Sequence, residues 1–111
     1  MVLSTIRMAI PVEKQNDALK TIRSIGLQTR DVPGCISYSI YKDLEDNNVL
    51  MLQTKWDNDS SLTLHIRSNI YRNLLLVLEM SFQQPEIIFD TISGSTGIET
   101  IEKIRSSNDC P

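Results

Sequence analysis

The order of two hydrophobic periods along the chain restricts the fold more than any other feature. Apolar residues recur at every second position, or form short apolar runs, in residues 2–10, 35–43, 49–56 and 86–92. They recur at helical spacing in residues 13–30 and again after residue 57. Alternation at period two is typical of strands and a period near 3.6 is typical of helices. The sequence therefore predicts an α+β fold of order βαββαβ, the ferredoxin-like arrangement, with an antiparallel four-stranded sheet and the helices on one face.

Short polar segments separate these elements. Pro33 and Gly34 predict a turn before the second strand. Asp57, Asn58 or Asp59 can cap the helix that follows the third strand, because a short side-chain oxygen accepts a free backbone N–H of the first turn. We expect this second helical region to break near Ser68–Asn69 and to continue from about residue 70 to residue 80.

The two faces of the second strand differ in polarity. Alternation predicts one face with Ile36, Tyr38 and Ile40, and an opposite face with Cys35, Ser37, Ser39 and Tyr41. Which of these faces meets the helices is left open by the pattern.

The third strand begins "VLML" and is therefore apolar on both of its faces. Two helical regions can cover only one face of the sheet, and an uncovered apolar face is typical of an interaction surface. The sequence predicts a homodimer in which two sheets meet as a dimeric α+β barrel, in keeping with the frequency of two-fold dimers.

Composition excludes several classes of partner. The chain has 111 residues, which is the length of one domain, and a net charge of −3 without a basic stripe, so we expect no nucleic-acid partner. The apolar runs are shorter than the roughly 20 residues of a membrane-spanning helix, so we expect no membrane association. Cys35 and Cys110 lie far apart, with no Cys/His cluster for a metal site. We expect a cytoplasmic protein with reduced thiols.

Residues 93–111 form an extension beyond the domain of residues 1–92. Thr96 and Glu99 have the spacing of a capping box, and a short helix is predicted over about 97–105. Ile98, Ile101 and Ile104 recur at about one-turn intervals. This apolar stripe needs a docking place, either on its own barrel or on a dimer partner.

Several motifs in a fixed order resemble the antibiotic biosynthesis monooxygenase family. "PGCISYSIYKD", "LQTKW", "SSLTLHIRSNIYRNLL" and "PEIIF" succeed one another over roughly residues 2–92. Members of that family typically show a Pro-Gly-Cys turn with a Tyr three residues after the Cys, a Trp closing the third strand, and a His about nine residues later, followed by an aromatic residue. The matching positions are Pro33, Gly34, Cys35, Tyr38, Trp56, His65 and Tyr71.

The resemblance implies a dimeric α+β barrel. For many members it also implies oxygenation of quinols or polyketide aromatics by molecular oxygen without metal, flavin or haem. A second His that the family often shows is replaced by Ile70. Haem-degrading relatives place an Asn, a Trp and a haem-ligating His where this chain has Ile6, His65 and Leu75, so haem degradation is disfavoured.

The leading hypothesis is an enzyme, a cofactor-independent monooxygenase for a small flat phenol, quinol or polyketide-like molecule in an apolar pocket. His65 is the candidate catalytic base or hydrogen-bond donor, because a free imidazole has a pKa near 6.5. The candidates for substrate binding are Trp56 and Tyr38 as pocket walls, Tyr71 as an orienting hydroxyl, and Arg67 and Arg72 as cations for an anionic oxygen.

Other functions and ordinary structural roles compete with this hypothesis. Trp56 at a strand end and a lone His65 on a helix flanked by Leu62 and Ile66 are also typical of core packing. The same barrel also hosts isomerases of small carbonyl compounds, and a ligand-binding dimer without turnover is a third alternative. Fold alone does not decide among them.

Overall fold

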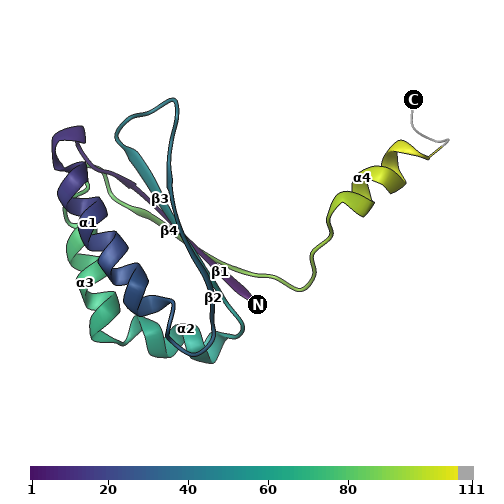
Figure 1. The fold of residues 1–111 in the computed structure, drawn as a ribbon, viewed down its shortest axis with the longest axis horizontal. Coiled ribbons are helices and arrows are strands. Elements are labelled where there is room, and N and C mark those ends of the chain that lie inside the picture. The colour runs from purple at the N-terminus through teal and green to yellow at the C-terminus, as the bar shows by residue number, and fades with distance from the viewer. Residues whose placement is uncertain (108–111) are drawn as a thin grey trace.

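The computed structural model describes residues 1–107, and it confirms the predicted order of elements (Figure 1). The elements are β1 Val2–Ala9, α1 Val12–Thr29, β2 Cys35–Lys42, β3 Val49–Trp56, α2 Asp59–Ile66, α3 Asn69–Leu78, β4 Glu86–Thr91 and α4 Ile98–Arg105. Within residues 1–107, no helix has both the length and the apolar character needed to cross a membrane.

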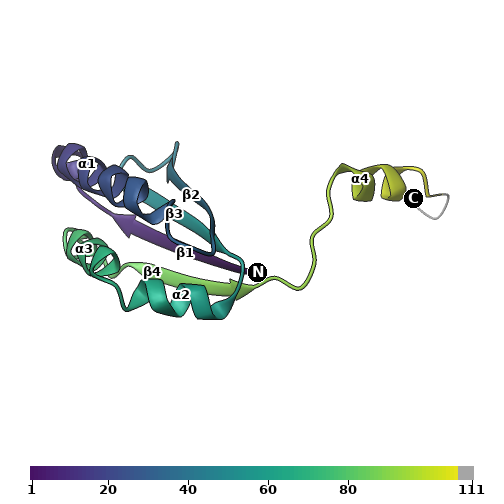
Figure 2. The same cartoon turned by 60° about the horizontal axis from the view of Figure 1, so that its bottom comes forward.

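The four strands form one antiparallel sheet in the order β2-β3-β1-β4, as predicted. In the centre of the sheet, Val2 pairs with Trp56 and Ile6 with Leu52. The helices α1, α2 and α3 lie on one face of the sheet (Figures 1 and 2). Alternate residues of the two central strands therefore point into a layer between sheet and helices.

The main hydrophobic core fills this layer under α1 and α3. Strand residues Ile6 and Leu52 meet Ala18 and Ile22 of α1 and Leu74 of α3. The buried polar groups around α1 have backbone partners: Gln15 Nε2 donates to Ile10 O at 2.9 Å, Thr29 Oγ1 donates to Ile25 O at 2.8 Å, and the Tyr38 hydroxyl donates to Ile22 O at 2.8 Å. This side of the core is therefore close-packed and fully hydrogen-bonded at these groups.

The start of β2 departs from the predicted alternation. Cys35 pairs with Trp56 and Ser37 with the next residue of β3, so Ile36 is bulged out of the register. Cys35 consequently packs against the cluster of Trp56, whereas Ile36 is exposed. The prediction that Ile36 shares the face of Tyr38 was wrong, because a β-bulge inserts one residue and reverses the alternation.

Two side-chain caps define the break in the second helical region. The Asn58 side chain accepts a hydrogen bond from the Ser61 N–H at 2.9 Å and starts α2. The Ser68 hydroxyl accepts one from the Tyr71 N–H at 3.3 Å and starts α3, while it donates to His65 O at 2.6 Å. The predicted break near Ser68–Asn69 is confirmed, and Ser68 joins the end of α2 to the start of α3.

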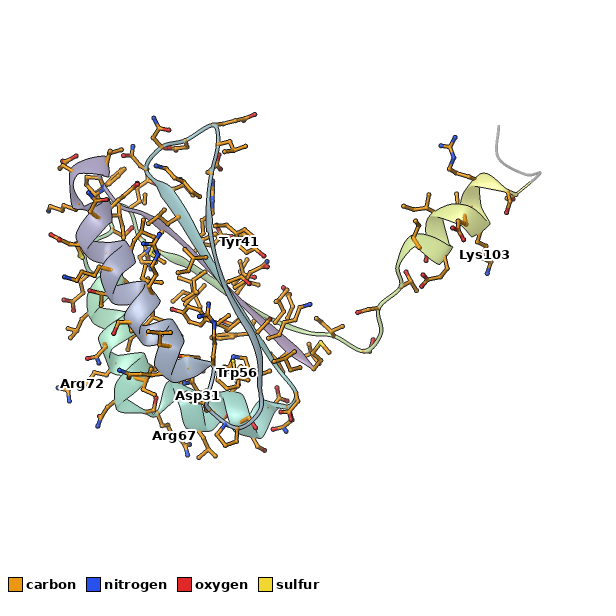
Figure 3. The ribbon with its side chains drawn as sticks, viewed as in Figure 1. Asp31, Tyr41, Trp56, Arg67, Arg72 and Lys103 are labelled. Carbon is orange, nitrogen blue, oxygen red and sulfur yellow. The ribbon has the colours of Figure 1, made fainter. Side chains whose placement is uncertain are left out.

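The face of the sheet opposite the helices is mixed in character. Leu3, Met51 and Ile88 lie on it beside the polar residues Thr5 and Gln53. Tyr41 also points to this side, away from the helices (Figure 3). The expected homodimer through this face stays a prediction.

The C-terminal segment leaves the sheet after β4. The predicted short helix is confirmed as α4, but the expected Thr96 cap is wrong. Gly97 occupies the cap position without a side-chain cap, and Glu99 Oε1 accepts from the Gly97 N–H at 2.7 Å. Glycine here needs no capping side chain because the glutamate reaches back to the backbone. Cys110 lies outside the described residues.

Candidate active site

His65 lies near the C-terminal end of α2 and is buried, with 5% of its surface exposed. Leu62, one turn earlier, is also buried, whereas Ile66 is exposed. The expectation that His65 flanks a buried Leu62–Ile66 stripe was therefore wrong. His65 and Ile66 are three and four residues after Leu62, so both lie near its face of the helix. In a helix of two turns, the tilt of the helix against the sheet decides which of the two points inward.

Three rings from three elements meet at this position. The rings of Trp56 on β3 and His65 on α2 have centroids 4.7 Å apart and are tilted by 31°. The ring of Tyr71 on α3 meets His65 edge-on, at 5.5 Å and 84°. Trp56 Nε1 donates to Thr54 Oγ1 at 3.0 Å, which fixes the indole in its plane. We call Trp56, His65 and Tyr71 the ring cluster.

The imidazole of His65 holds a buried nitrogen with no hydrogen-bond partner. Its Nδ1 has none among the described residues. Burial lowers the pKa of His65 below its usual value, since a charged ring loses hydration there. The imidazole is therefore neutral near pH 7 and is able to accept a proton. Burial raises the pKa of Tyr71, so its hydroxyl keeps its proton and is able to donate a hydrogen bond.

A small hollow of about 280 Å³ lies beside His65. Its lining comes from the turn before β2 and from α2 and its cap: Val32, Pro33, Ser61, Leu64, His65 and Ser68. This volume is at the lower end of the range for small-molecule sites, and it exceeds the roughly 150 Å³ of a cavity that holds one benzene. The hollow therefore has room for a small molecule.

The Pro33–Gly34 turn packs directly against the start of α2. Gly34 has φ +90°, a conformation that L side chains rarely adopt, and a Cβ there would overlap the side chain of Ser61. Gly34 O accepts a hydrogen bond from the Asp57 N–H at 3.0 Å. The turn thus fixes one wall of the hollow. Sequence reasoning identified the turn but did not place Val32, Ser61, Leu64 or Ser68 at the site.

Tyr38, a predicted pocket wall, lies against α1 instead of the hollow. Its hydroxyl donates to Ile22 O, and the guanidinium carbon of Arg30 lies 5.6 Å from its ring centroid. Arg30 also donates to the carbonyl of Tyr38 at 3.3 Å. Burial raises the pKa of this hydroxyl well above its usual value. The functional groups of Tyr38 are therefore already engaged in the core around α1.

The other two predicted substrate-binding residues lie at the surface. Arg67 and Arg72 are exposed, and both side chains point away from the sheet (Figure 3). Neither lines the hollow, and of the predicted site residues only His65 does. Of the residues proposed from the sequence, the structure brings together Trp56, His65 and Tyr71.

Neither a reactive thiol nor a metal-ligand cluster accompanies the ring cluster in the described part of the chain. Cys35 is half-buried, and burial raises the pKa of its thiol, which favours the unreactive protonated form. No group of three His, Cys, Asp or Glu side chains within residues 1–107 is placed to hold a metal ion.

The fold is shared with several solved structures. A conserved protein from Methanosarcina mazei Go1 matches with TM-score 0.76 and 26% identity, over 80% of this chain and 89% of that one. An antibiotic biosynthesis monooxygenase matches with TM-score 0.75 and 19% identity, over 85% and 100%. Rv0793 from Mycobacterium tuberculosis matches with TM-score 0.77 and 18% identity, over 86% and 98%.

The sequence itself identifies the family. No functionally curated protein matches it closely. The family profile described as "Antibiotic biosynthesis monooxygenase" matches residues 1–74, which include all three residues of the ring cluster. This match covers most of the chain, and the solved structures share its α+β ferredoxin-like fold. The chain therefore belongs to the antibiotic biosynthesis monooxygenase family.

Proposed function

We propose that this protein is a monooxygenase that oxidises a small flat phenol or quinol with molecular oxygen and without metal, flavin or haem. The single observation that supports it best is the buried, neutral His65 whose Nδ1 has no partner, placed in the ring cluster beside a small hollow. A substrate hydroxyl would supply the hydrogen bond that the imidazole lacks.

His65 acts as the general base in this proposal. It takes the proton of the substrate hydroxyl, and the resulting phenolate is electron-rich enough to pass an electron to O₂ directly. For a phenol that becomes a quinone, the substrate loses two hydrogens and gains one oxygen atom, while the second oxygen atom leaves as water. A neutral base near pH 7 meets the requirement that a general base be unprotonated at the working pH.

Trp56 and Tyr71 hold the imidazole in place in this proposal, since neither residue lines the hollow. The indole of Trp56 is buried and covers one face of His65. Tyr71 meets the imidazole edge-on, and its hydroxyl keeps its proton, so Tyr71 positions His65 without competing for the proton of the substrate. The exposed Arg67 and Arg72 have no part in this chemistry.

Oxygen uptake with a panel of hydroquinones and naphthols tests the proposal. His65→Gln is expected to lower the turnover number on the order of 10²-fold, the usual effect of losing a general base. Arg67→Gln, a surface substitution on the adjacent turn, is the matched control and is expected to keep the wild-type rate. Equal rates for His65→Gln and wild type, above the rate of spontaneous oxidation, would contradict the assignment of His65.

The same assay separates the alternatives. Isomerisation of a small carbonyl compound would use His65 as a base but would consume no oxygen. A ligand-binding dimer would bind a naphthol, with quenching of Trp56 fluorescence, and would release it unchanged. We propose further that the protein works as a homodimer in the cytoplasm, on the sequence grounds given above.

A further inference from the structure

The helix α4 carries an apolar stripe that stays exposed among residues 1–107. Ile98, Ile101 and Ile104 are 70%, 57% and 58% exposed. Residues 92–97 carry the helix away from the sheet, and both views show it standing apart (Figures 1 and 2). The radius of gyration is 17.0 Å, against about 13 Å expected for a compact chain of this length.

A groove of suitable size lies between α1 and the edge strand β2. Its volume is about 920 Å³, and its apolar lining comes from Leu19, Leu27, Ile40 and Leu50. An α-helix of eight residues is ~12 Å long and ~10 Å wide, which corresponds to roughly 900 Å³. The groove is therefore large enough to accept a helix of the length of α4.

The groove is basic, and the side of α4 that carries Glu99 and Glu102 complements it. Four cations surround the groove, and no carboxylate is among the residues that line it: the cations are Lys20, Arg23, Arg30 and Lys42. On α4, Glu99 and Glu102 lie three residues apart and therefore on one side of the isoleucine stripe, whereas the basic residues Lys103 and Arg105 are confined to the last turn. An apolar stripe with an acidic flank fits an apolar groove with a basic rim.

We propose that α4 of one copy docks in the groove between α1 and β2 of a second copy. Within one chain, β4 and β2 lie on opposite edges of the sheet, and the groove lies several residues further along the strands than Thr91. The end of β4 and the groove beside β2 are three strand spacings apart across the sheet and about five residues apart along the strands. Together these components give a distance of roughly 22 Å. The seven residue steps from Thr91 to Ile98 span at most ~24 Å when fully extended. The linker must therefore be almost fully stretched for α4 to reach the groove of its own chain.

Cysteine cross-linking between two differently tagged, co-expressed full-length chains tests this docking. Both chains carry Ser in place of Cys35 and Cys110; one carries Ile101→Cys and the other Leu27→Cys. After purification through one tag and mild oxidation, we expect a disulfide-linked heterodimer on a non-reducing gel. Leu76→Cys replaces Leu27→Cys in the control, because Leu76 is also exposed on a helix, α3, but lies outside the groove. This control is expected to give no cross-link above background.

The charge complementarity gives a second test. Arg23→Glu on the groove-bearing chain is expected to lower the cross-link yield severalfold, and Glu102→Arg on the partner is expected to restore it. Three results would overturn the proposal. The first is no heterodimer with Leu27→Cys, and the second is an equal yield with Leu76→Cys. The third is a doubly substituted chain, Leu27→Cys with Ile101→Cys, that cross-links only within itself.

Discussion

Two regions of the interior differ in whether their buried polar side chains have hydrogen-bond partners. Around α1, the side chains of Gln15, Thr29 and Tyr38 each donate to a backbone carbonyl. In the ring cluster, His65 Nδ1 is equally buried but has no hydrogen-bond partner within residues 1–107. A buried polar atom that lacks a hydrogen bond costs on the order of 1–3 kcal/mol, whereas a satisfied one contributes to stability.

This difference distinguishes a part of the core with satisfied polar groups from a part that holds an unpaired polar atom. Both regions are packed on the same face of the same sheet, so packing does not distinguish them. The nitrogen of His65 does, because it has no hydrogen-bond partner among residues 1–107. The same contrast explains why Tyr38, whose hydroxyl is already occupied, is a poor candidate for substrate binding although it is a family-motif residue.

The largest expected effect concerns whether the ring cluster is packed as firmly as the rest of the core. Trp56 is fully buried, and Trp56→Ala should lower the free energy of unfolding by about 4 kcal/mol. Leu52→Ala, in the core around α1, should cost about 3 kcal/mol. Urea unfolding followed by circular dichroism measures both, since Trp56 is the only Trp in the chain. A loss below about 1 kcal/mol for Trp56→Ala would mean a loose ring cluster.

The next effect concerns how tightly α1 is held against β2. A Cβ on Gly26 would lie 2.6 Å from Cε1 and 2.9 Å from Cδ1 of Tyr38. Gly26→Ala should therefore destabilise the protein by about 1 to 2 kcal/mol, although alanine is the better helix former. In the double variant with Tyr38→Leu, the two losses should be clearly less than additive. If the losses of unfolding free energy are additive in urea unfolding, the Cβ at position 26 does not clash with the Tyr38 ring.

A matched pair of phenylalanine substitutions tests the contrast itself. His65→Phe keeps a flat ring and removes the unpaired nitrogen, so it should raise the free energy of unfolding by about 1 kcal/mol. Tyr38→Phe removes a satisfied hydroxyl and should lower it by about 1 kcal/mol. Thermal melts of both variants measure the signs. Destabilisation by both substitutions would show that His65 Nδ1 has a partner in solution.

The smallest expected effect is a pH dependence that belongs to His65 alone. Its folded pKa is lowered by burial, so the unfolded chain, with a pKa near 6.5, binds the proton more readily. Stability should be complete above pH 6.5 and fall as the pH drops from 6.5 toward the folded pKa. His65 is the only His in the chain, and Asp43 and Glu99, whose pKa values are also lowered, titrate at more acidic pH.

Urea midpoints at pH 7.5 and pH 5 measure this effect. The wild-type midpoint is expected to be lower at pH 5 than at pH 7.5. The midpoint of His65→Phe is expected to be nearly the same at both pH values. A midpoint that falls equally in both proteins would assign the pH dependence to other groups and would remove the support for a depressed pKa at His65.

Local chemistry made much of the fold predictable from the sequence. The alternation of apolar residues identified β1, and polar residues located the start of α2 after Asn58 and the break before α3 at Ser68–Asn69. These features depend on residues close together in the chain, because strand periodicity and helix capping act over two to four positions. The ordered motifs around Trp56 and His65 likewise indicated the family from the sequence.

Long-range packing decided the rest. The bulge at Ile36, the close contact between Gly26 and Tyr38, and the outward position of Arg67 each depend on an element distant in sequence. The position of α4, apart from the sheet, is likewise not expressed by any local pattern. The sequence by itself therefore determined the order of elements, the break in the second helical region and the family. Only the tertiary structure decided which side chains share the buried layer, because that choice depends on how helices tilt against the sheet and where its register shifts.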